Sequence, residues 1–263
     1  MAVGSSTGLT YSGYLALDEV LAAQRPVSDV HDELLFIVVH QVHELWFKQM
    51  LHELGQAQAR LVAGETERAL RSLQRLRTVL EATTVPIGVM ETMTPQEFAL
   101  FRDRLGTSSG FQSVQFREVE AVLGGRRRQA IAHLERDSEE RRRVEAAMNR
   151  PSLLDSALVC LALHGYPVPL EILQRDTSQP LAPHEELRHA LTTVRDEDGP
   201  EARMCEELLA VDRGLREWRR RHVEMVERMI GAQPGTAGSA GAAYLRTTLA
   251  TPYFPDLWEV WSR

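Results

Sequence analysis

A helical spacing of apolar residues runs through almost the whole chain and limits what it can fold into. Alternating β-branched runs are few, and Leu, Ala, Glu, Arg and Gln dominate the composition. The chain has 263 residues, which is enough to bury a sizeable core. We therefore predict an all-α fold in which residues 1–263 form a single domain of long antiparallel helices.

Capping residues place one of these helices. Thr94 is a candidate N-cap, Pro95 stands at the first helical position, and Glu97 completes a capping box. The helix that they begin is predicted to cover residues 95–105 and to end at Gly106. The other predicted helices cover residues 32–62, 66–84, 111–122, 126–147, 151–164 and 202–230.

Charge and cysteine content exclude several classes of protein. The formal net charge is -7, whereas a general nucleic-acid binder is normally basic, so we expect no nucleic-acid partner. The arginine triplets at 126–128, 141–143 and 219–221 lie among acidic neighbours, and we interpret them as solvated helix faces. Cys160 and Cys205 form no CxxC pair, which argues against a disulfide scaffold or a cysteine-based zinc site.

The N-terminal sequence is not that of a targeting segment. The stretch MAVGSSTGLTYSGYL has no basic region followed by an apolar core, as a signal peptide would. No window holds the roughly 20 apolar residues that a membrane span requires. We therefore expect a soluble, cytoplasmic protein with no membrane contact.

Histidines interrupt the apolar stretch FIVVHQVHELWFKQMLHE at residues 36–53. At helical spacing, His40 and His43 fall on one stripe with Phe36, so both face whatever the helix buries. They are either core histidines satisfied by hydrogen bonds or ligands of a metal. A di-iron bundle site needs two Glu-x-x-His pairs, and only one such pair stands at residues 186–189. That count disfavours a bundle metal site.

A second unusual histidine lies near the C-terminal end of the last long helix. Trp218, His222, Met225 and Met229 share one stripe. A lone histidine there is either a satisfied core residue or the axial ligand of a haem, which requires a neutral imidazole in an apolar wall. The glycine-rich stretch at 231–243 is predicted to be a loop that exposes backbone N–H groups to a polar ligand.

One arginine is a candidate for binding a carboxylate. Phe98 and Arg102 are four residues apart on the short capped helix, so they share a face. An arginine beside phenylalanines binds a carboxylate through two parallel hydrogen bonds. The alternative is a surface arginine paired with a nearby acid.

Five segments, taken in order along the chain, resemble one known family. They are YSGYLALDEVLAAQRP, HDELLFIVVHQVHELWFKQMLHEL, METMTPQEFALFRDRLGTSSGFQSVQFREVE, EWRRRHVEMVERMIG and GTAGSAGAAYLRTTL, and the match extends from about Tyr11 to Trp258. The family that they closely resemble is tryptophan 2,3-dioxygenase. The resemblance implies an all-α haem oxygenase that inserts O2 into the indole C2–C3 bond of L-tryptophan, giving N-formylkynurenine in tryptophan catabolism. It implies haem b as cofactor, O2 as co-substrate and a homotetramer.

The matched motifs also imply roles for individual residues. His222 matches the axial ligand of the haem iron, and His40 matches the distal histidine that meets the indole N–H. Arg102 matches the arginine that holds the substrate carboxylate, and Thr236 matches the threonine that meets the substrate ammonium. A site for tryptophan needs all of these groups, because tryptophan is a zwitterion with a flat apolar body.

Further matched residues imply the surroundings of the substrate and the cofactor. Phe36 and Phe98 match the aromatic wall around the indole, while Ser109 and Gly235 match positions near the haem. An N-terminal segment is lent to the pocket of a neighbouring subunit in the family, and its matching residues here are Tyr11, Tyr14 and Leu15.

The glycine-rich loop departs from the family pattern. Ala237 replaces a glycine, and Ala240 stands where serine is common. An alanine held at positive φ costs roughly 1 kcal/mol, so the loop shape and the substrate that fits are open. One alternative is therefore a haem monooxygenase that acts on tryptophan or a substituted tryptophan in a specialised pathway, with an oxindole-type product. An alternative of another class is a non-catalytic haem-binding or haem-sensing protein.

Overall fold

A computed structural model describes residues 9–236, 241–249 and 251–262 of the protein. These residues form helices and connecting turns, with no β-strand among them, which confirms the prediction of an all-α fold. No helix in the described ranges has the length and apolar character needed to cross a membrane. The α-helices are α1 (Tyr11–Leu15), α2 (Leu17–Leu21), α3 (His31–Val62), α4 (Thr66–Ala82), α5 (Val85–Met90), α6 (Pro95–Arg102), α7 (Val114–Val122), α8 (Glu139–Met148), α9 (Leu153–Leu163), α10 (Leu170–Leu173), α11 (Glu185–Glu197), α12 (Pro200–Ile230), α13 (Ala242–Arg246) and α14 (Pro255–Trp261). The 3-10 helices are η1 (Asp103–Leu105), η2 (Gly110–Gln112) and η3 (Arg128–Ile131).

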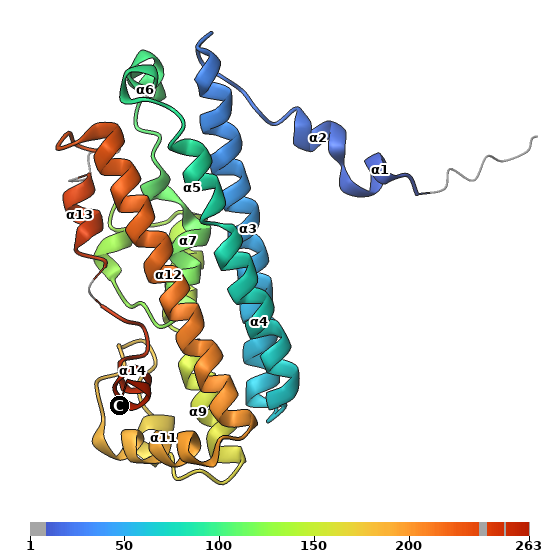
Figure 1. Ribbon diagram of the computed structural model, residues 1–263, viewed down its shortest axis with the longest axis vertical. Helices are drawn as coiled ribbons and strands as arrows, with labels where there is room; N and C mark the ends of the chain where they lie inside the picture. Colours follow the sequence, from blue (N-terminus) through green and yellow to red (C-terminus); the bar gives the residue numbers. More distant parts are fainter. Residues whose placement is uncertain (1–8, 237–240, 250, 263) are drawn as a thin grey trace, which may run out of the picture.

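Three long helices form the frame of the molecule. α3 runs antiparallel to α4 and α12, and α4 packs against both of the others (Figure 1). Along α4, Leu73, Leu76 and Leu80 follow the helical spacing of three and four residues, and all three are buried. Because each buried leucine contributes roughly 1.5–3 kcal/mol, this stripe holds α4 against its two neighbours.

Most of the predicted helices lie close to the observed ones. The helix predicted over 95–105 is α6 followed by η1, and its capping box is present. The backbone N–H of Glu97 donates to the Thr94 hydroxyl at 3.2 Å, and the Glu97 carboxylate accepts from the backbone N–H of Thr94 at 2.7 Å. Gly106 follows with a φ of 58°, a conformation that favours glycine.

The prediction of one helix over residues 126–147 is wrong. The chain forms η3 and α8 there, with a turn between them. Ile131 of η3 and Val144 of α8 are both fully buried in the same small cluster, and a straight helix would not bring them together. Ser138 then starts α8 by accepting a hydrogen bond at its side chain from a backbone N–H group. The sequence analysis predicted none of the shorter helices α1, α2, α5, α10, α13 and α14, nor the 13-residue α11.

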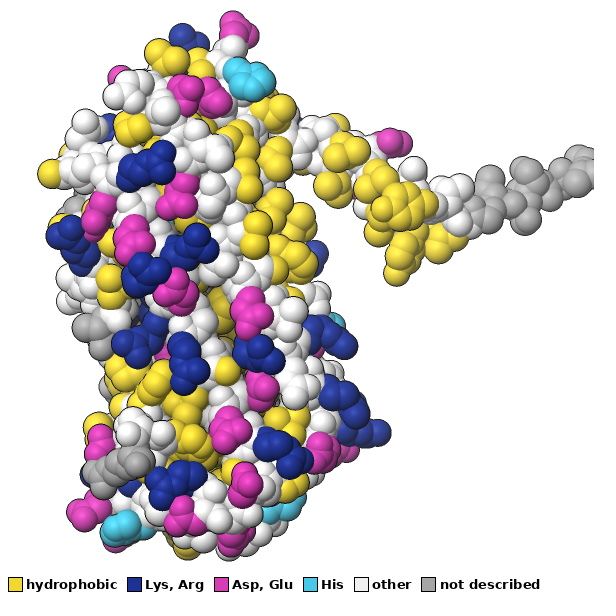
Figure 2. Space-filling view, viewed as in Figure 1, with side chains coloured by type: hydrophobic (Ala, Val, Ile, Leu, Met, Phe, Trp, Pro, Cys, Tyr) yellow, Lys and Arg dark blue, Asp and Glu magenta, His cyan; other side chains and the backbone are white. Residues whose placement is uncertain are grey.

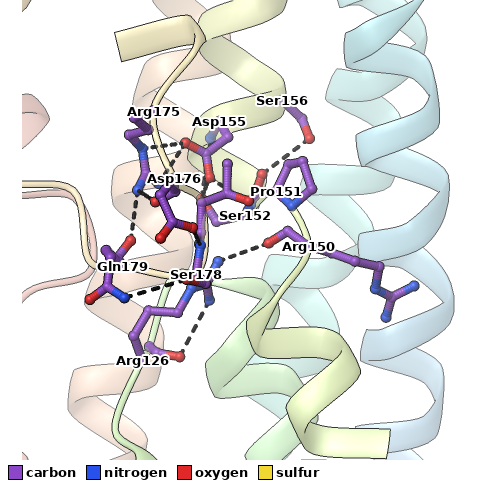
Figure 3. Close-up of polar contacts among 12 residues, drawn as sticks. Arg126, Arg150, Pro151, Ser152, Asp155, Ser156, Arg175, Asp176, Ser178 and Gln179 are labelled. Atoms are coloured by element: carbon purple, nitrogen blue, oxygen red, sulfur yellow. Dashed lines mark hydrogen bonds and ion pairs between the residues drawn. The ribbon is translucent and has the colours of Figure 1, made fainter. Parts of the chain in front are cut away.

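Polar contacts fasten the segment between α9 and α11 to the bundle (Figure 3). The guanidinium of Arg175 donates to both carboxylate oxygens of Asp155, at 2.7 and 2.9 Å. Arg126 donates to the carbonyl of Thr177 at 2.9 Å. Arg126 is therefore held by acceptors and half-buried, which makes the interpretation of the 126–128 triplet as a solvated helix face wrong for this residue.

The N-terminal helices α1 and α2 form an arm that projects away from the bundle (Figure 1). Tyr11 and Tyr14 on this arm are 75% and 71% exposed. Figure 2 shows hydrophobic side chains gathered on the arm and along the adjoining flank of α3. The exposed hydrophobic residues of α3 include Leu34 and Leu45. A contiguous apolar surface of this kind is typical of a contact between chains.

A buried carboxylate on α12 joins the C-terminal part of the chain to the bundle. One oxygen of Asp212 accepts from the indole N–H of Trp258 at 2.8 Å. The same oxygen accepts from the backbone N–H groups of Tyr253 at 2.9 Å and Phe254 at 3.3 Å. These three donors offset part of the cost of removing the carboxylate from water, and burial still raises the pKa of Asp212 above its ordinary value.

We expect Asp212→Ala to lower the free energy of unfolding by roughly 2–4 kcal/mol, because three buried donors lose their acceptor. Urea denaturation followed by circular dichroism measures the change. The matched control is Asp137→Ala, since Asp137 is exposed and its loss should change stability by less than about 0.5 kcal/mol. Equal stability of the two variants would contradict the assigned role of Asp212.

Candidate active site

A large cavity lies between α3, α6, α7, α12 and the loop that precedes α13. The space between these elements totals about 1580 Å³, which includes open solvent at its mouth. The residues selected from the sequence that line it are Phe36, His40, Phe98, Arg102, Ser109, His222, Gly235 and Thr236.

His40 lines this cavity, and one of its ring nitrogens has no hydrogen-bond partner among the described residues. Its Nδ1 lies 2.7 Å from the carbonyl oxygen of Phe36, and because that oxygen only accepts, Nδ1 carries the hydrogen. Burial lowers the pKa of His40 below its ordinary value, so the ring is neutral at pH 7. A methyl group built on Gly110 would lie 3.8 Å from Nε2, so no side chain fills the space there. Nε2 can therefore accept a hydrogen bond from a bound molecule.

His43 has a different environment from His40, although both line the cavity. Its Nδ1 lies 2.8 Å from the carbonyl oxygen of Val39, and its Nε2 lies 3.1 Å from the carbonyl oxygen of Thr83. Burial lowers the pKa of His43 as well. A neutral imidazole carries a single N–H, so His43 can donate to one of these two carbonyls. Either bond agrees with the interpretation of a core histidine held by hydrogen bonding, and the contact with Thr83 joins α3 to the end of α4.

His222 faces the cavity from α12 and has no hydrogen-bond partner within the described part of the chain. Its imidazole is stacked on the indole of Trp218, with ring centroids 5.1 Å apart and an interplanar angle of 5°. Burial lowers the pKa of His222 to about 4, and the nearby His43 and His40 act in the same direction. The ring is therefore neutral at pH 7, oriented by Trp218 and free to ligate a metal.

Arg102 holds the loop that follows α12. Its two terminal nitrogens donate to the Gln233 side chain at 2.6 Å and to the carbonyl of Pro234 at 2.7 Å. Its Nε is buried and has no partner among the described residues. The Thr236 hydroxyl donates to the carbonyl of Ser108, so the same loop is joined to the segment after α6. A cation and a small hydroxyl thus lie at one part of the cavity, where a zwitterion can bind.

Aromatic rings form the wall between Arg102 and His40. The rings of Phe36 and Phe98 are stacked with centroids 5.6 Å apart, and the ring of Phe36 lies 4.2 Å from that of His40. Phe101 packs edge-on against both phenylalanines from beneath. This wall is apolar and flat, which suits an aromatic ring.

Other residues selected from the sequence have different positions. Ser109 begins η2 and accepts from the backbone N–H of Phe111 at 3.3 Å. Ala237 and Ala240 lie outside the described residues. The arm residues do not line the cavity of their own chain, and these are Tyr11, Tyr14 and Leu15.

A buried group of charges beside the cavity was missed by the sequence analysis. Arg117 and Arg219 both pair with Glu120, and Arg219 also donates to the hydroxyl of Tyr253. Burial raises the pKa of Glu120, but the two guanidinium charges outweigh burial and leave this pKa below its ordinary value. The interpretation of the 219–221 triplet as a solvated face is therefore wrong for Arg219. Arg117 and Glu120 are three residues apart on one helix, so the sequence could have predicted their ion pair. Arg219 is about a hundred residues from Glu120 along the chain, so no local spacing indicates that it pairs with the same carboxylate.

The donor set and the apolar lining of the cavity fit the haem that the sequence resemblance implies. A haem needs one axial ligand and apolar walls on both faces of its ring. His222 supplies a neutral imidazole, and Trp218, Met225 and Met229 line the cavity on the same helix. On the facing helix, Nε2 of His40 is free for a second molecule.

Comparisons with known proteins agree with this arrangement. The model of the family described as tryptophan 2,3-dioxygenase matches residues 2–164 and 183–263. A tryptophan 2,3-dioxygenase of Anaeromyxobacter sp. (strain K) is 52% identical over 255 residues, which cover 97% of this chain and 96% of the relative. That of Herpetosiphon aurantiacus is 48% identical and covers 97% and 98% of the two chains. That of Caulobacter vibrioides is 44% identical, with 96% and 97% covered.

The family match and the relatives both extend over nearly the whole chain, and the matched ranges contain α3, α6 and α12, which carry the cavity residues. The chain thus belongs to the tryptophan 2,3-dioxygenase family.

Proposed function

We propose that the protein is a haem-dependent tryptophan 2,3-dioxygenase, which inserts O2 into the indole C2–C3 bond of L-tryptophan to give N-formylkynurenine. The observation that carries the proposal is one cavity with His222 on one helix, a free Nε2 of His40 on the facing helix, and Arg102 at its edge. The names of the relatives support the same reaction.

In this proposal His222 is the axial ligand of haem b. Its neutral imidazole and the absence of a hydrogen-bond partner among the described residues support the assignment. Haem supplies the binding and activation of O2 when it is bound. Ser109 and Gly235 lie at the cavity wall and would contact the cofactor.

The substrate would be held by four kinds of contact. Arg102 binds the carboxylate through its guanidinium fork, and Thr236 accepts a hydrogen bond from the ammonium. Phe36 and Phe98 enclose the indole, whose N–H donates to Nε2 of His40. These contacts fix the C2–C3 edge in one place, and proximity then favours transfer of both oxygen atoms to it.

In this proposal, the role of His40 in catalysis is to orient the indole, and it does so as an uncharged imidazole. Burial keeps its imidazole neutral, so Nε2 accepts and does not donate. The apolar wall around it excludes water, which strengthens this single hydrogen bond.

We propose further that the chain acts as one domain within a cytoplasmic homotetramer. The exposed apolar arm supports this assembly, because α1 extends away from its own cavity. In such an assembly Tyr11, Tyr14 and Leu15 would close the pocket of a neighbouring subunit. The pathway would be tryptophan catabolism through kynurenine.

The two alternatives are less well supported. A haem monooxygenase with an oxindole-type product depends on the loop around Ala237, and no described residue favours it. A non-catalytic haem sensor has no use for groups that bind an amino acid, yet Arg102 and Thr236 lie in the same cavity as His222.

Isotopic labelling tests the reaction. With ferrous enzyme, L-tryptophan and 18-O2, we expect a ring-opened product that carries both labelled atoms, because the fixed C2–C3 edge receives both. Mass spectrometry of the product measures the label. A ring-intact product with one labelled atom would instead favour the monooxygenase.

Replacement of the axial ligand tests the cofactor site. His222→Ala should yield folded protein with little tightly bound haem, because the iron loses its protein ligand. Haem content and the Soret absorption band measure the effect. His52→Ala is the matched control, since His52 lies on α3 outside the cavity lining, and it should keep the native spectrum. An unchanged spectrum in the His222 variant would refute the assignment.

Replacement of Arg102 tests the carboxylate site. Arg102→Leu should weaken tryptophan binding by roughly 2–4 kcal/mol, because a buried carboxylate loses its charge-assisted partner. The variant should bind tryptamine, which lacks the carboxylate, as the native protein does. Arg104→Leu, two residues along and exposed, is the control and should bind tryptophan normally. The assignment fails if native protein binds tryptamine and tryptophan equally.

A further inference from the structure

A second arginine faces the cavity from α7 and still has donor capacity. Arg117 is 6% exposed and lines the cavity. It donates to Glu120 and, at 3.3 Å, to the carbonyl of Phe111. Its Nε is buried and has no partner among the described residues. A buried guanidinium nitrogen without an acceptor is costly unless a bound molecule supplies one.

The charges around Arg117 do not cancel. Arg117 and the 5% exposed Arg219 carry two positive charges, and Glu120 carries one negative charge. Burial raises the pKa of the Tyr253 hydroxyl and lowers that of His133, so both are neutral.

The cavity's other carboxylate does not balance this charge. Glu44 accepts instead from the side-chain amide of Gln115 at 2.7 Å, and it pairs with neither arginine in the described part of the chain. A net positive charge is thus left beside the cavity, where an anion would be stabilised.

Ring contacts connect this charge to the wall that carries His222. The Arg117 guanidinium lies over the Phe116 ring at 5.7 Å, and Phe116 lies 5.0 Å from Trp218 between ring centroids. Trp218 in turn is stacked on His222 at 5.1 Å. Arg117 and His222 therefore line the same cavity and are connected by this series of ring contacts.

The position of Arg117 is distinct from the proposed substrate site. Arg102 belongs to α6 and binds the loop at Gln233 and Pro234, whereas Arg117 belongs to α7 and binds Glu120. Figure 1 shows α6 at one end of the bundle and α7 nearer its middle. Arg102 and Arg117 could each bind a carboxylate, so the cavity suits two ligands that carry carboxylates in different places. An amino acid supplies one, and haem carries its own two at one edge of the ring.

We propose that Arg117 would bind a carboxylate of the haem and so help to hold the cofactor in the cavity. This inference rests on the proposed function, since it requires haem in the cavity. Phe111 and Phe116 hold the guanidinium between them and keep it aimed at the cavity. Arg219 keeps Glu120 occupied from its other side, so one guanidinium charge is left for the ligand.

The test compares haem with its dimethyl ester, which has the same ring and iron but no free carboxylate. Full-length protein is loaded with either group, and its release to an excess of a haem-scavenging protein is timed. Native protein should lose the diester roughly 10- to 100-fold faster than haem, since a charge-assisted hydrogen bond is absent. This comparison uses only the native protein, so it does not depend on whether a variant folds.

The variants assign the effect to one residue. Arg117→Leu should lose haem as fast as native protein loses the diester, and its own release of the diester should be unchanged. Arg117→Lys keeps the charge without the fork and should be intermediate. Arg102→Leu is the matched arginine from the same cavity and should keep the full preference for haem.

The outcomes separate the inference from the proposed function. Equal release of haem and diester by native protein would overturn the inference while leaving the haem site intact. The inference would also be overturned if the Arg117→Leu variant retained haem over the diester as strongly as the native protein does. If that variant instead lost its preference for tryptophan over tryptamine, the carboxylate would belong to the substrate and the inference would be wrong. Failure of native protein to bind either ring would refute the proposed function itself.

Discussion

Burial keeps the imidazoles of His40 and His222 uncharged, and the chemistry of the cavity depends on this. A protonated His222 has no lone pair for a metal, and a protonated His40 donates where an acceptor is needed. Both pKa values lie below the ordinary value because the surrounding helices exclude water, and for His222 the value is about 4. The frame of α3, α4 and α12 therefore does more than stabilise the fold, because it fixes the protonation state of the site.

In the described part of the chain, positive charges meet this largely apolar space at two separate places. Arg102 holds the loop at Gln233 and Pro234, so a carboxylate that binds Arg102 must compete with contacts that also shape the cavity mouth. Arg117 lies deeper and is only partly neutralised by Glu120. Separated cations of this kind attract anionic groups to two places without charging the wall between them.

The same physical rule explains the contrast between His40 and His43. The two residues are neighbours on one helical stripe, and each binds a carbonyl of its own helix through Nδ1. Among the described residues, only His43 has a second backbone acceptor close to its ring, the carbonyl of Thr83 at 3.1 Å. The carbonyl of Thr83 therefore accounts for the difference between the two residues. His43 contacts it and joins two helices, whereas Nε2 of His40 is left for a ligand.

The sequence by itself determined the helices, the stripe that buries His40 and His222, and the capping box at Thr94, because helical spacing and capping are local properties. The motifs also identified the family, since they occur in order along the chain. Only the tertiary structure decided which nitrogen of each histidine is free and which arginines are buried. Arg219 looked solvated among its sequence neighbours, but its partner Glu120 comes from another helix, and contacts between distant segments leave no periodic signal in a single sequence.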